Sequence, residues 1–349
     1  MTLLFMSVLF LKAEEKHTPS GEATHQIEKK KFEPGSFMFD HIGDAYEWHI
    51  MTVGHKHISI PLPVILYSKT KGLSIFMSGR FHHGHNSYKG YKLEMSGENK
   101  GKITDEEGNL PLDLSITKNV ASLLFSIGLI LWIFLAMAKP YKRNALKPPR
   151  GIQSFLEPIV VFIRDEVAIP SIGKKKYEVF MPYLLTVFFF ILFNNVLGLI
   201  PVPPGGANLT GNISVTFVLA LFTFIITTIR GNRNYWKHIF NTPGVPVWLK
   251  IPVPLMPLVE TIGIFTKPFV LMVRLFANIT AGHIIALGFL SLIYIFAEMS
   301  TGLAYGVSIV SIVFLIFMTF LELLVAFIQA FVFTFLSALY FGMATEEHH

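Results

Sequence analysis

The sequence predicts an all-α polytopic membrane protein with five membrane elements, the last two forming a long, steeply tilted helical hairpin. A small β-rich domain is expected before them, outside the membrane. Of the 349 residues, 52% are hydrophobic and 33 are Phe, a composition typical of membrane proteins. Apolar runs long enough to cross a bilayer recur along the chain, and Lys and Arg gather at their ends, where they set topology.

The composition also excludes several classes of function. The chain has no Cys, which excludes disulfides, thiolate metal sites and a thiol nucleophile. Its formal net charge of +6 does not indicate nucleic acid binding, because the basic residues lie beside apolar runs and no base-reading motif is present. We therefore expect the lipid bilayer as surroundings, with no nucleic acid partner, cofactor or metal.

The segment before the membrane region divides into two parts. Residues 1–13, "MTLLFMSVLFLKA", contain an apolar stretch like that of a signal peptide, without a basic segment before it. Residues 14–116 are expected to form an extracytoplasmic domain, because "HKHISIPLPVILYS" and "GLSIFMSGRF" alternate as short strands do. The His pairs in "HKH" and "HHGH" have a spacing that can bind zinc, but a polar strand and loop surface is the preferred interpretation.

Residues 117–349 are predicted to form the membrane domain, which begins with a span at about 117–138. The following "KPYKRNALKPPR" carries five Lys or Arg and should face the cytoplasm. Residues 152–169 have apolar side chains at helical spacing, which predicts an amphipathic helix on the membrane surface. The basic run at 174–176 keeps this helix on the same side.

Two further spans fix the predicted orientation of the termini. The span at about 179–200 ends in "LIPVPPGGANLTGN", an uncharged loop rich in Pro and Gly that should lie outside. The span at about 212–229 leads to the basic "RGNRNYWKH", which should lie inside. The N-terminus is then outside and the C-terminus cytoplasmic.

The last two elements are too long for upright spans. Leu255–Met299 would be about 67 Å long as a helix and Leu303–Gly342 about 60 Å, against a bilayer core of about 30 Å. Either each run is broken or the helices are steeply tilted. Pro268 could bend the first run, but the second contains no Pro. Unbroken, it would lean about 60° from the membrane normal.

Polar residues interrupt both runs of this hairpin, at Arg274, Asn278 and His283 in the first and at Glu322 and Gln329 in the second. An Arg at the bilayer centre costs roughly 2.5 to 3.5 kcal/mol on insertion scales, and it stays charged. With a turn at 300–302, residues of equal depth have numbers that average about 302. Arg274 should therefore lie level with Gln329, and His283 with Glu322.

Structural interpretations of these residues remain open. Asn and Gln often tie membrane helices together, a His is often a packing residue, and Lys267 near the interface can extend toward water. Arg274 is harder to explain in this way, because Glu322 is expected nearer the outer surface and Glu260 lies about 21 Å away along the helix axis. An unpaired Arg at this depth implies a carboxylate on another subunit.

Several stretches resemble subunit a of the F-type ATP synthase. "RLFANITAGH" is similar to its Arg-Leu-x-x-Asn-x-x-x-Gly signature, "FLELLVAFIQAFVFTFLSALY" to its last helix and "MATEEHH" to its tail. "FNNVLGLIP" and "GNISVTFVLAL" are similar to its second and third spans, so the resemblance covers about 117–349. In some bacterial members the residues at 283 and 322 are exchanged, which favours direct contact between them. Gly198 departs from relatives that carry an Asp there.

The resemblance implies an ion-translocating stator subunit with two aqueous half-channels. Arg274 would face the carboxylate of the c-ring and block direct leakage, with Asn278 in the same signature. Glu260 would stand at the inner half-channel. The outer half-channel would be lined by His283, Glu322, Asn195 and Gln329.

The resemblance also implies partners and a place in the cell. The c-ring of the rotor and the peripheral-stalk b subunits would be partners of the chain in a bacterial cell inner membrane. The subunit would perform no bond chemistry, so it would not be catalytic alone.

Two other classes of function are weighed against this one. A stand-alone ion channel or secondary transporter would usually show internal repeats, and none is evident. A haem-bearing electron carrier needs a pair of axial ligands in the membrane, whereas His283 is the one His within a predicted span. Copurification of a ring of small c-subunits would separate these alternatives from the stator.

Overall fold

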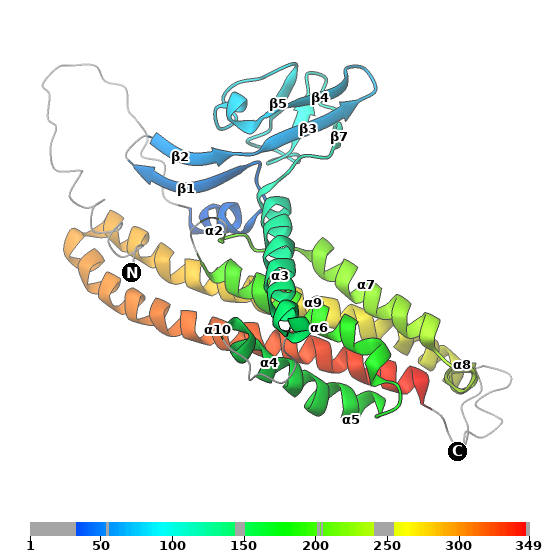
Figure 1. The fold of residues 1–349 in the computed structure, drawn as a ribbon. Helices are drawn as coiled ribbons and strands as arrows, with labels where there is room; N and C mark the ends of the chain where they lie inside the picture. The colour runs from blue at the N-terminus through cyan, green and yellow to red at the C-terminus, as the bar shows by residue number, and fades with distance from the viewer. Residues whose placement is uncertain are drawn as a thin grey trace, which may run out of the picture. The chain divides into compact units, whose positions relative to one another are not determined.

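The computed structural model describes residues 33–53, 56–143, 151–200, 203, 205–240 and 255–346. The predicted signal-peptide-like segment 1–13 lies outside these residues. The described chain forms two compact units: one holds the residues up to Lys118 with His283–Phe320, the other Asn119–Gly282 with the residues from Leu321 on. Figure 1 shows the elements in chain order.

The N-terminal part of the first unit contains small antiparallel sheets, which support the prediction of a β-rich domain. Strands β1 and β2 form a ribbon, β4, β3 and β7 form a three-stranded sheet in that order, and β5 pairs with β6. The elements are α2 (Pro34–Ile42), β1 (Glu47–Val53), β2 (Lys56–Pro61), β3 (Pro63–Ser68), β4 (Gly72–Met77), η1 (Ser78–Phe81), β5 (Tyr91–Leu93), β6 (Ile103–Asp105) and β7 (Leu112–Asp113).

Alternation along β3 and β4 gives this domain a core of its own. Val64 and Leu66 of β3 are fully buried, because every second side chain of a strand points to the same face. They cluster with Phe76, Phe81, Tyr91 and Ile103.

The second unit is helical throughout its described elements. It contains α3 (Lys118–Arg143) from Asn119 on, α4 (Ile152–Phe162), the π-helix η2 (Ile163–Ala168), α5 (Ile169–Ile172), α6 (Tyr177–Leu199), α7 (Ile213–Arg230) and α8 (Arg233–Phe240). The predicted spans coincide with α3, α6 and α7. The predicted helix at 152–169 is helical but changes to a π-helix at Ile163, where Ile163 and Val167 are fully buried. Its position on the membrane surface stays a prediction.

The hairpin consists of α9 (Leu255–Met299) and α10 (Thr301–Thr345), each an unbroken helix of 45 residues. Pro268 lies within α9 and does not end it. The predicted turn at 300–302 is too long: Ser300 alone separates the helices, because α10 starts at Thr301. The Ser300 amide donates to Phe296 at 3.1 Å and the Ala304 amide to Ser300 at 3.0 Å, so the helical hydrogen bonding continues almost through the turn. Tilt in a membrane stays a prediction.

Five described helices are long and apolar enough to cross a membrane: α3, α6, α7, α9 and α10. This agrees with the five predicted membrane elements. These helices qualify by length and composition alone.

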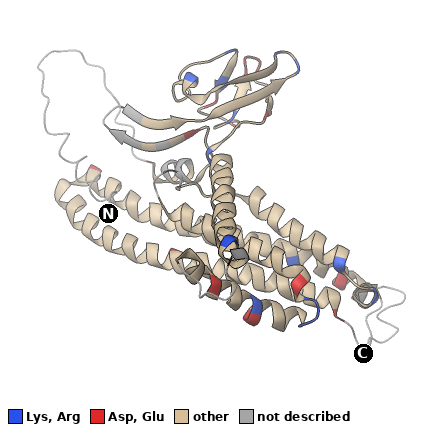
Figure 2. Ribbon diagram, in the orientation of Figure 1, with Lys and Arg blue, Asp and Glu red and all other residues tan. Residues whose placement is uncertain are grey.

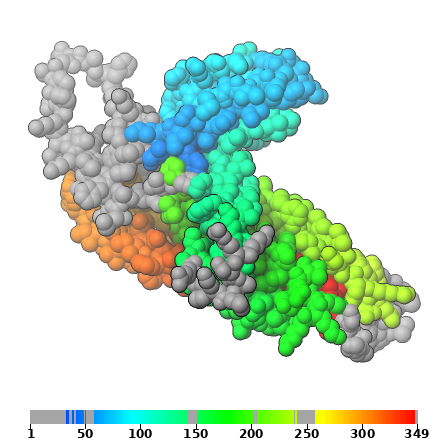
Figure 3. Space-filling view, viewed as in Figure 1, coloured from blue at the N-terminus to red at the C-terminus, as the bar shows by residue number. Residues whose placement is uncertain are grey.

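Aromatic and hydroxyl side chains join the helices of the second unit. Phe189 of α6 meets Phe134 of α3 edge to face, and Phe180 of α6 stacks on Phe341 of α10. The Tyr183 hydroxyl lies 2.7 Å from that of Thr223, which ties α6 to α7, and the two helices lie side by side in Figure 3. The core that results is built largely from α6 and the C-terminal part of α10.

The last turn of α10 is held by one lysine side chain, one backbone amide and one close approach. Carbonyl groups at a helix end have no partner within the helix. Lys176 Nζ donates to the Thr345 carbonyl at 2.8 Å, and the Asn232 amide donates to that of Ala344 at 2.9 Å. Gly342 packs so closely on the Ser171 carbonyl that a Cβ would overlap it. This packing positions the part of α10 that faces α9.

Candidate functional site

Charged side chains are sparse along the hairpin, as Figure 2 shows. Helix α10 carries one charged residue, Glu322, while α9 carries Glu260, Lys267, Arg274 and Glu298. Charge is unfavourable within an apolar membrane helix, so the few charges that remain mark candidate functional positions.

Arg274 points away from the core of the second unit. Its neighbours Leu271 and Leu275 are 1% and 0% exposed, which fixes the rotation of α9 about its axis. Arg274 is exposed on the surface of the chain, and among the described residues it forms no ion pair. The exposed guanidinium is therefore free to meet a group on another molecule.

Asn278 and Gln329 join the two helices of the hairpin one helical turn beyond Arg274. Asn278 Nδ2 donates to Gln329 Oε1 at 2.8 Å, and Gln329 is 2% exposed. The sequence predicts that Arg274 is level with Gln329. The observed partner of Gln329, Asn278, is one helical turn away from Arg274. It also bears out the structural interpretation that such amides tie helices together.

Glu322 lies against Gly282, the Gly of the "RLFANITAGH" signature. A Cβ built on Gly282 would come within 2.8 Å of Glu322 Oε1, so the missing side chain makes room for the carboxyl group. Among the described residues, Glu322 Oε1 is buried and has no hydrogen-bond partner. His283 follows Gly282 in the chain but belongs to the first unit, so direct contact between His283 and Glu322 stays a prediction.

Asn195 is held by two bonds within the second unit. Its Nδ2 donates to the Ala326 carbonyl of α10 at 3.3 Å, and its Oδ1 accepts from Thr210 Oγ1 at 2.5 Å. Sequence reasoning missed Thr210, which lies in the uncharged loop before α7. The signal for it is weak, since Thr is common in loops.

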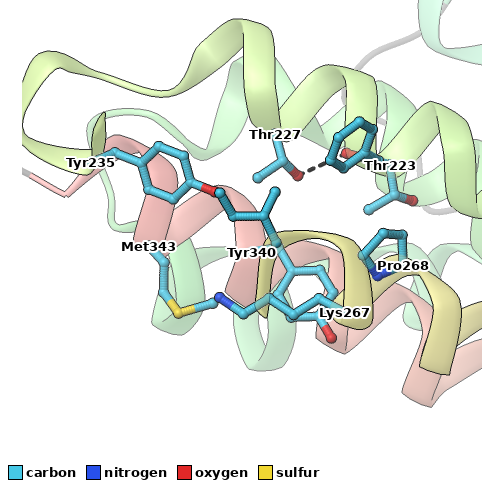
Figure 4. Close-up of a pocket in the computed structure, with 9 residues that line it drawn as sticks. Thr223, Thr227, Tyr235, Lys267, Pro268, Tyr340 and Met343 are labelled. Atoms are coloured by element: carbon cyan, nitrogen blue, oxygen red, sulfur yellow. Dashed lines mark hydrogen bonds between the residues drawn. The ribbon is translucent and has the colours of Figure 1, made fainter. Parts of the chain in front are cut away.

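A pocket lies between α7, α8, α9 and α10 near the end of α10 (Figure 4), with about 330 Å³ of empty space that is partly open to the surroundings. Lys267 Nζ lies 5.7 Å from the centre of the Tyr340 ring, a cation–π distance. Thr227 Oγ1 donates to the Thr223 carbonyl at 2.7 Å. The lining residues are Thr223, Phe224, Thr227, Tyr235, Ile264, Lys267, Pro268, Tyr340 and Met343.

Glu260 lies close enough to Tyr235, one of the residues that line this pocket, for its charge to act on the Tyr235 hydroxyl group. Burial, and then the charge of Glu260, raise the pKa of Tyr235. Sequence reasoning singled out Glu260 but missed Tyr235 and Tyr340, whose hydroxyl groups add polar surface at the same end of the hairpin.

The His residues of the N-terminal domain form no metal centre among the described residues, where no group of three potential ligands occurs. His83 Nδ1 instead lies 2.8 Å from Glu47 Oε2. His55 and the side chain of His57 lie outside the described part of the chain.

The apolar helices and the polar residues on the hairpin define a polytopic membrane protein with a line of ionisable and amide side chains. The family model of the ATP synthase A chain matches residues 120–342. The chain belongs to this family, subunit a of the F-type ATP synthase.

Individual relatives agree with this assignment. ATP synthase subunit a 2 of Chlorobaculum tepidum is 46% identical over 67% of this chain, which spans 64% of that relative's length. ATP synthase subunit a of Chloroherpeton thalassium is 43% identical over 68% of this chain and 69% of its own. ATP synthase subunit a of Myxococcus xanthus is 44% identical over 68% of this chain and 75% of its own length. The relatives are bacterial, in agreement with a multi-pass inner membrane protein.

A second family model, described as a domain of unknown function (DUF8433), matches residues 37–122. It covers the small sheets of the first unit and ends just inside α3. The chain thus joins a domain of unknown function to the membrane helices of subunit a.

Proposed function

We propose that this chain is the ion-translocating stator subunit of an F-type ATP synthase, coupling proton flow to rotation of a c-ring. The observation that carries the proposal is Arg274, a permanent cation exposed on an apolar helix, without an ion pair among the described residues. Such a residue is unfavourable in a bilayer unless an anion on a partner faces it. A carboxylate in mid-membrane on each c-subunit would supply that anion.

The rotor carboxylate can face lipid only when it is neutral, because an isolated ionised group is very unfavourable there. Arg274 would attract the ionised form and hold it between two aqueous half-channels. Its charge would also repel protons that pass directly from one half-channel to the other. Rotation then follows from protonation on one side and release on the other.

The remaining polar residues divide between the two half-channels. His283, Glu322, Asn195 and Gln329 would line the outer one, with Asn278 holding Gln329 in place through the 2.8 Å bond. Glu260 would stand at the inner one, and its charge acts on Tyr235 at the pocket of Figure 4. Among the described residues, the buried Glu322 Oε1 has no hydrogen-bond partner, which supports a role of this carboxyl group in proton exchange or water binding.

The proposed orientation places the N-terminus outside and the C-terminus in the cytoplasm. The partners would be the c-ring, the peripheral-stalk b subunits and the lipid bilayer. The chain would carry out no bond chemistry, since ATP would be made elsewhere in the complex.

The test is to reconstitute the complete synthase with Arg274→Ala in vesicles and to measure ATP synthesis and passive proton leak together. Synthesis should be lost while the complex stays assembled, and the leak should persist or rise. Arg274→Lys should also fail, because Lys lacks the planar fork and can lose its proton when buried.

Arg164→Ala is the matched control. Arg164 is exposed and bonded to Asp165 at 2.7 Å, and such surface pairs contribute little, so synthesis should stay near wild type. Full ATP synthesis in Arg274→Ala would show that Arg274 is structural and would overturn the proposal.

A further inference from the structure

One face of the three-stranded sheet in the N-terminal domain is apolar and exposed. In β3 the alternate side chains of Val64 and Leu66 lie in the core, so their neighbours point to the opposite face. On that face Tyr67 lies opposite Leu73 of β4 and opposite Leu112 of β7. The main side chains of this apolar face are between 45% and 61% exposed: Tyr67, Leu73, Ile75, Met77, Leu112 and Leu114.

The register of the sheet makes the apolar face continuous. Ile65 and Pro63 of the middle strand lie opposite Ile75 and Met77 of β4, and directly opposite side chains lie on the same face of a sheet. Beyond the end of β7, the Leu114 amide donates to the Ile65 carbonyl at 2.9 Å, which keeps the chain paired as far as Leu114. Apolar side chains therefore extend across all three strands.

The charged groups of this sheet lie away from the apolar face. Asp113 is the one charged residue in β3, β4 and β7. It pairs with the core residue Leu66, and its carboxylate accepts from the Tyr46 hydroxyl. Lys69 is exposed, but it lies in the turn between β3 and β4. An apolar patch of this kind is rare on soluble proteins and marks a site that binds a protein or a membrane.

The chemistry of the apolar face favours lipid over a protein. Even the buried core of a protein interface is only about 65% apolar, and such interfaces contain hydrogen bonds. On the apolar face Tyr67 alone carries a hydroxyl group, and the other side chains are aliphatic or, in Met77, a thioether. Tyr67 lies at the end of the face nearest Lys69 in the chain. Tyr and Lys are side chains that suit the boundary between hydrocarbon and lipid headgroups.

The chain also connects the apolar face directly to a membrane helix. Between Leu114 and Lys118, where α3 begins, lies at most about 14 Å of extended chain. Helix α3 is long and apolar enough to cross a membrane. Lys118 is fixed to the domain, because its Nζ donates to the Gly43 carbonyl at 3.0 Å and its backbone amide to the Ala45 carbonyl at 2.8 Å. The domain is therefore held next to the point where α3 enters the bilayer.

We propose that the apolar face of the N-terminal domain lies in the lipid leaflet that α3 enters first. The sheet binds the bilayer as an interfacial amphipathic helix does, with apolar side chains among the acyl chains and polar edges in the headgroup region. This accounts for a sheet that is apolar on both faces, since one face covers the core of the domain and the other contacts lipid. The role belongs to the domain of unknown function and does not depend on ion transfer by the hairpin.

The experiment places an environment-sensitive fluorophore on the apolar face of the complete synthase in vesicles. The chain has no Cys, so Ile75→Cys gives it one thiol to label, and unsubstituted synthase treated in the same way gives the background of the other subunits. Because β3 separates β4 from β7 in the sheet, a label on β4 reports on the face and not only on the nearness of α3. Emission should lie at short wavelength and should be quenched when lipids with brominated acyl chains replace ordinary lipids.

The matched control is Glu98→Cys, which labels an exposed position in the segment between β5 and β6. Its emission should lie at long wavelength and should not respond to brominated lipids. Leu73→Asp combined with Ile75→Cys should weaken the quenching, because a charge on the same face opposes contact with acyl chains. Unchanged quenching in this double variant would show that the label inserts by itself and would overturn the proposal.

Two further results would contradict lipid contact. Long-wavelength emission from labelled Ile75→Cys, equal to that of Glu98→Cys, would show that the apolar face lies in water. Short-wavelength emission that brominated lipids do not quench would show that protein covers the face, whether another subunit, a second copy or another part of this chain. If Ile75→Cys does not assemble, Tyr67→Cys on the middle strand is held to the same criteria.

Discussion

At the scale of single residues, the position of the Glu322 carboxyl group depends on an absent side chain. Gly282 of α9 leaves the space in which Glu322 lies, and an added Cβ would meet Oε1 at 2.8 Å and Cδ at 3.3 Å. Cβ atoms hardly ever approach another atom as closely as 2.8 Å, so the Glu322 carboxyl group would have to move. The close approach of α9 and α10 thus explains why the signature has a Gly at position 282.

Gly282→Ala should lower proton-driven ATP synthesis, because displacement of the Glu322 carboxyl group disturbs transfer to its neighbours. We expect a loss on the order of tenfold, as for small displacements of reacting groups. The measurement is ATP synthesis in vesicles at matched amounts of assembled complex. Gly263→Ala in the same helix, where a Cβ meets nothing within 4 Å, should stay near wild type. Equal rates in the two variants would contradict the role of Gly282.

The exchange of His283 and Glu322 tests whether the two side chains meet. His283→Ala or Glu322→Ala alone should slow ion flow, because the remaining group is left buried without its partner. The double variant His283→Glu with Glu322→His should restore much of the rate of proton pumping. The prediction that His283 and Glu322 are in direct contact is wrong if the double variant is as inactive as the single ones.

At the scale of elements, the long helices α9 and α10 raise the question of how they fit a bilayer. Each has 45 residues without a break, hence about 67 Å of helix against a hydrocarbon core of about 30 Å. Both helices are apolar over most of their length. Steep tilt, which stays a prediction, would keep both apolar surfaces in lipid or against a partner.

The tilt can be measured from the depth of spin labels placed along α10. An upright helix changes depth by about 1.5 Å per residue, whereas a lean of about 60° reduces this to about 0.75 Å. Labels at exposed apolar positions such as Ile309, Ile316 and Leu323 in the reconstituted synthase should give the smaller value. A depth change near 1.5 Å per residue would show that α10 is upright.

At the scale of the whole molecule, the chain combines the membrane helices of the subunit a family with a small N-terminal domain that has a hydrophobic core of its own. In the small domain, the Tyr46 hydroxyl bonds to Asp113, and burial and this carboxylate raise the pKa of Tyr46. The apolar helices instead leave much of their surface exposed in the isolated chain. Helices of this kind require lipid or other subunits around them.

The complete assembly should therefore come with the chain when it is purified. A tag on this chain, with extraction in a mild detergent, should bring a ring of small c-subunits and the b subunits in fixed proportion. Arg274→Ala should retain them, since loss of one charge removes an unfavourable group from the bilayer. A chain that purifies alone and conducts ions in vesicles would favour a stand-alone channel.

The sequence alone predicted the five apolar helices that the described residues contain, with their limits correct to within a few residues, because a long apolar run has few other stable structures in a bilayer. It also identified the candidate polar residues, since charge in an apolar run is conspicuous. It placed Glu322 within one residue of its observed neighbour Gly282, because a hairpin with a short turn pairs residues by distance from the turn.

Only the tertiary structure decided the contacts that depend on side-chain direction or on residues far apart in the chain. The bond from Asn278 to Gln329, the bond from Thr210 to Asn195 and the contact of Lys118 with Gly43 have no local pattern. The turn at Ser300 and the π-helix after Phe162 were missed because packing, and not propensity, fixes the last turn of a helix. Hydrophobic periodicity reports which residues avoid water, whereas the partner of a buried polar group is chosen by the fold as a whole.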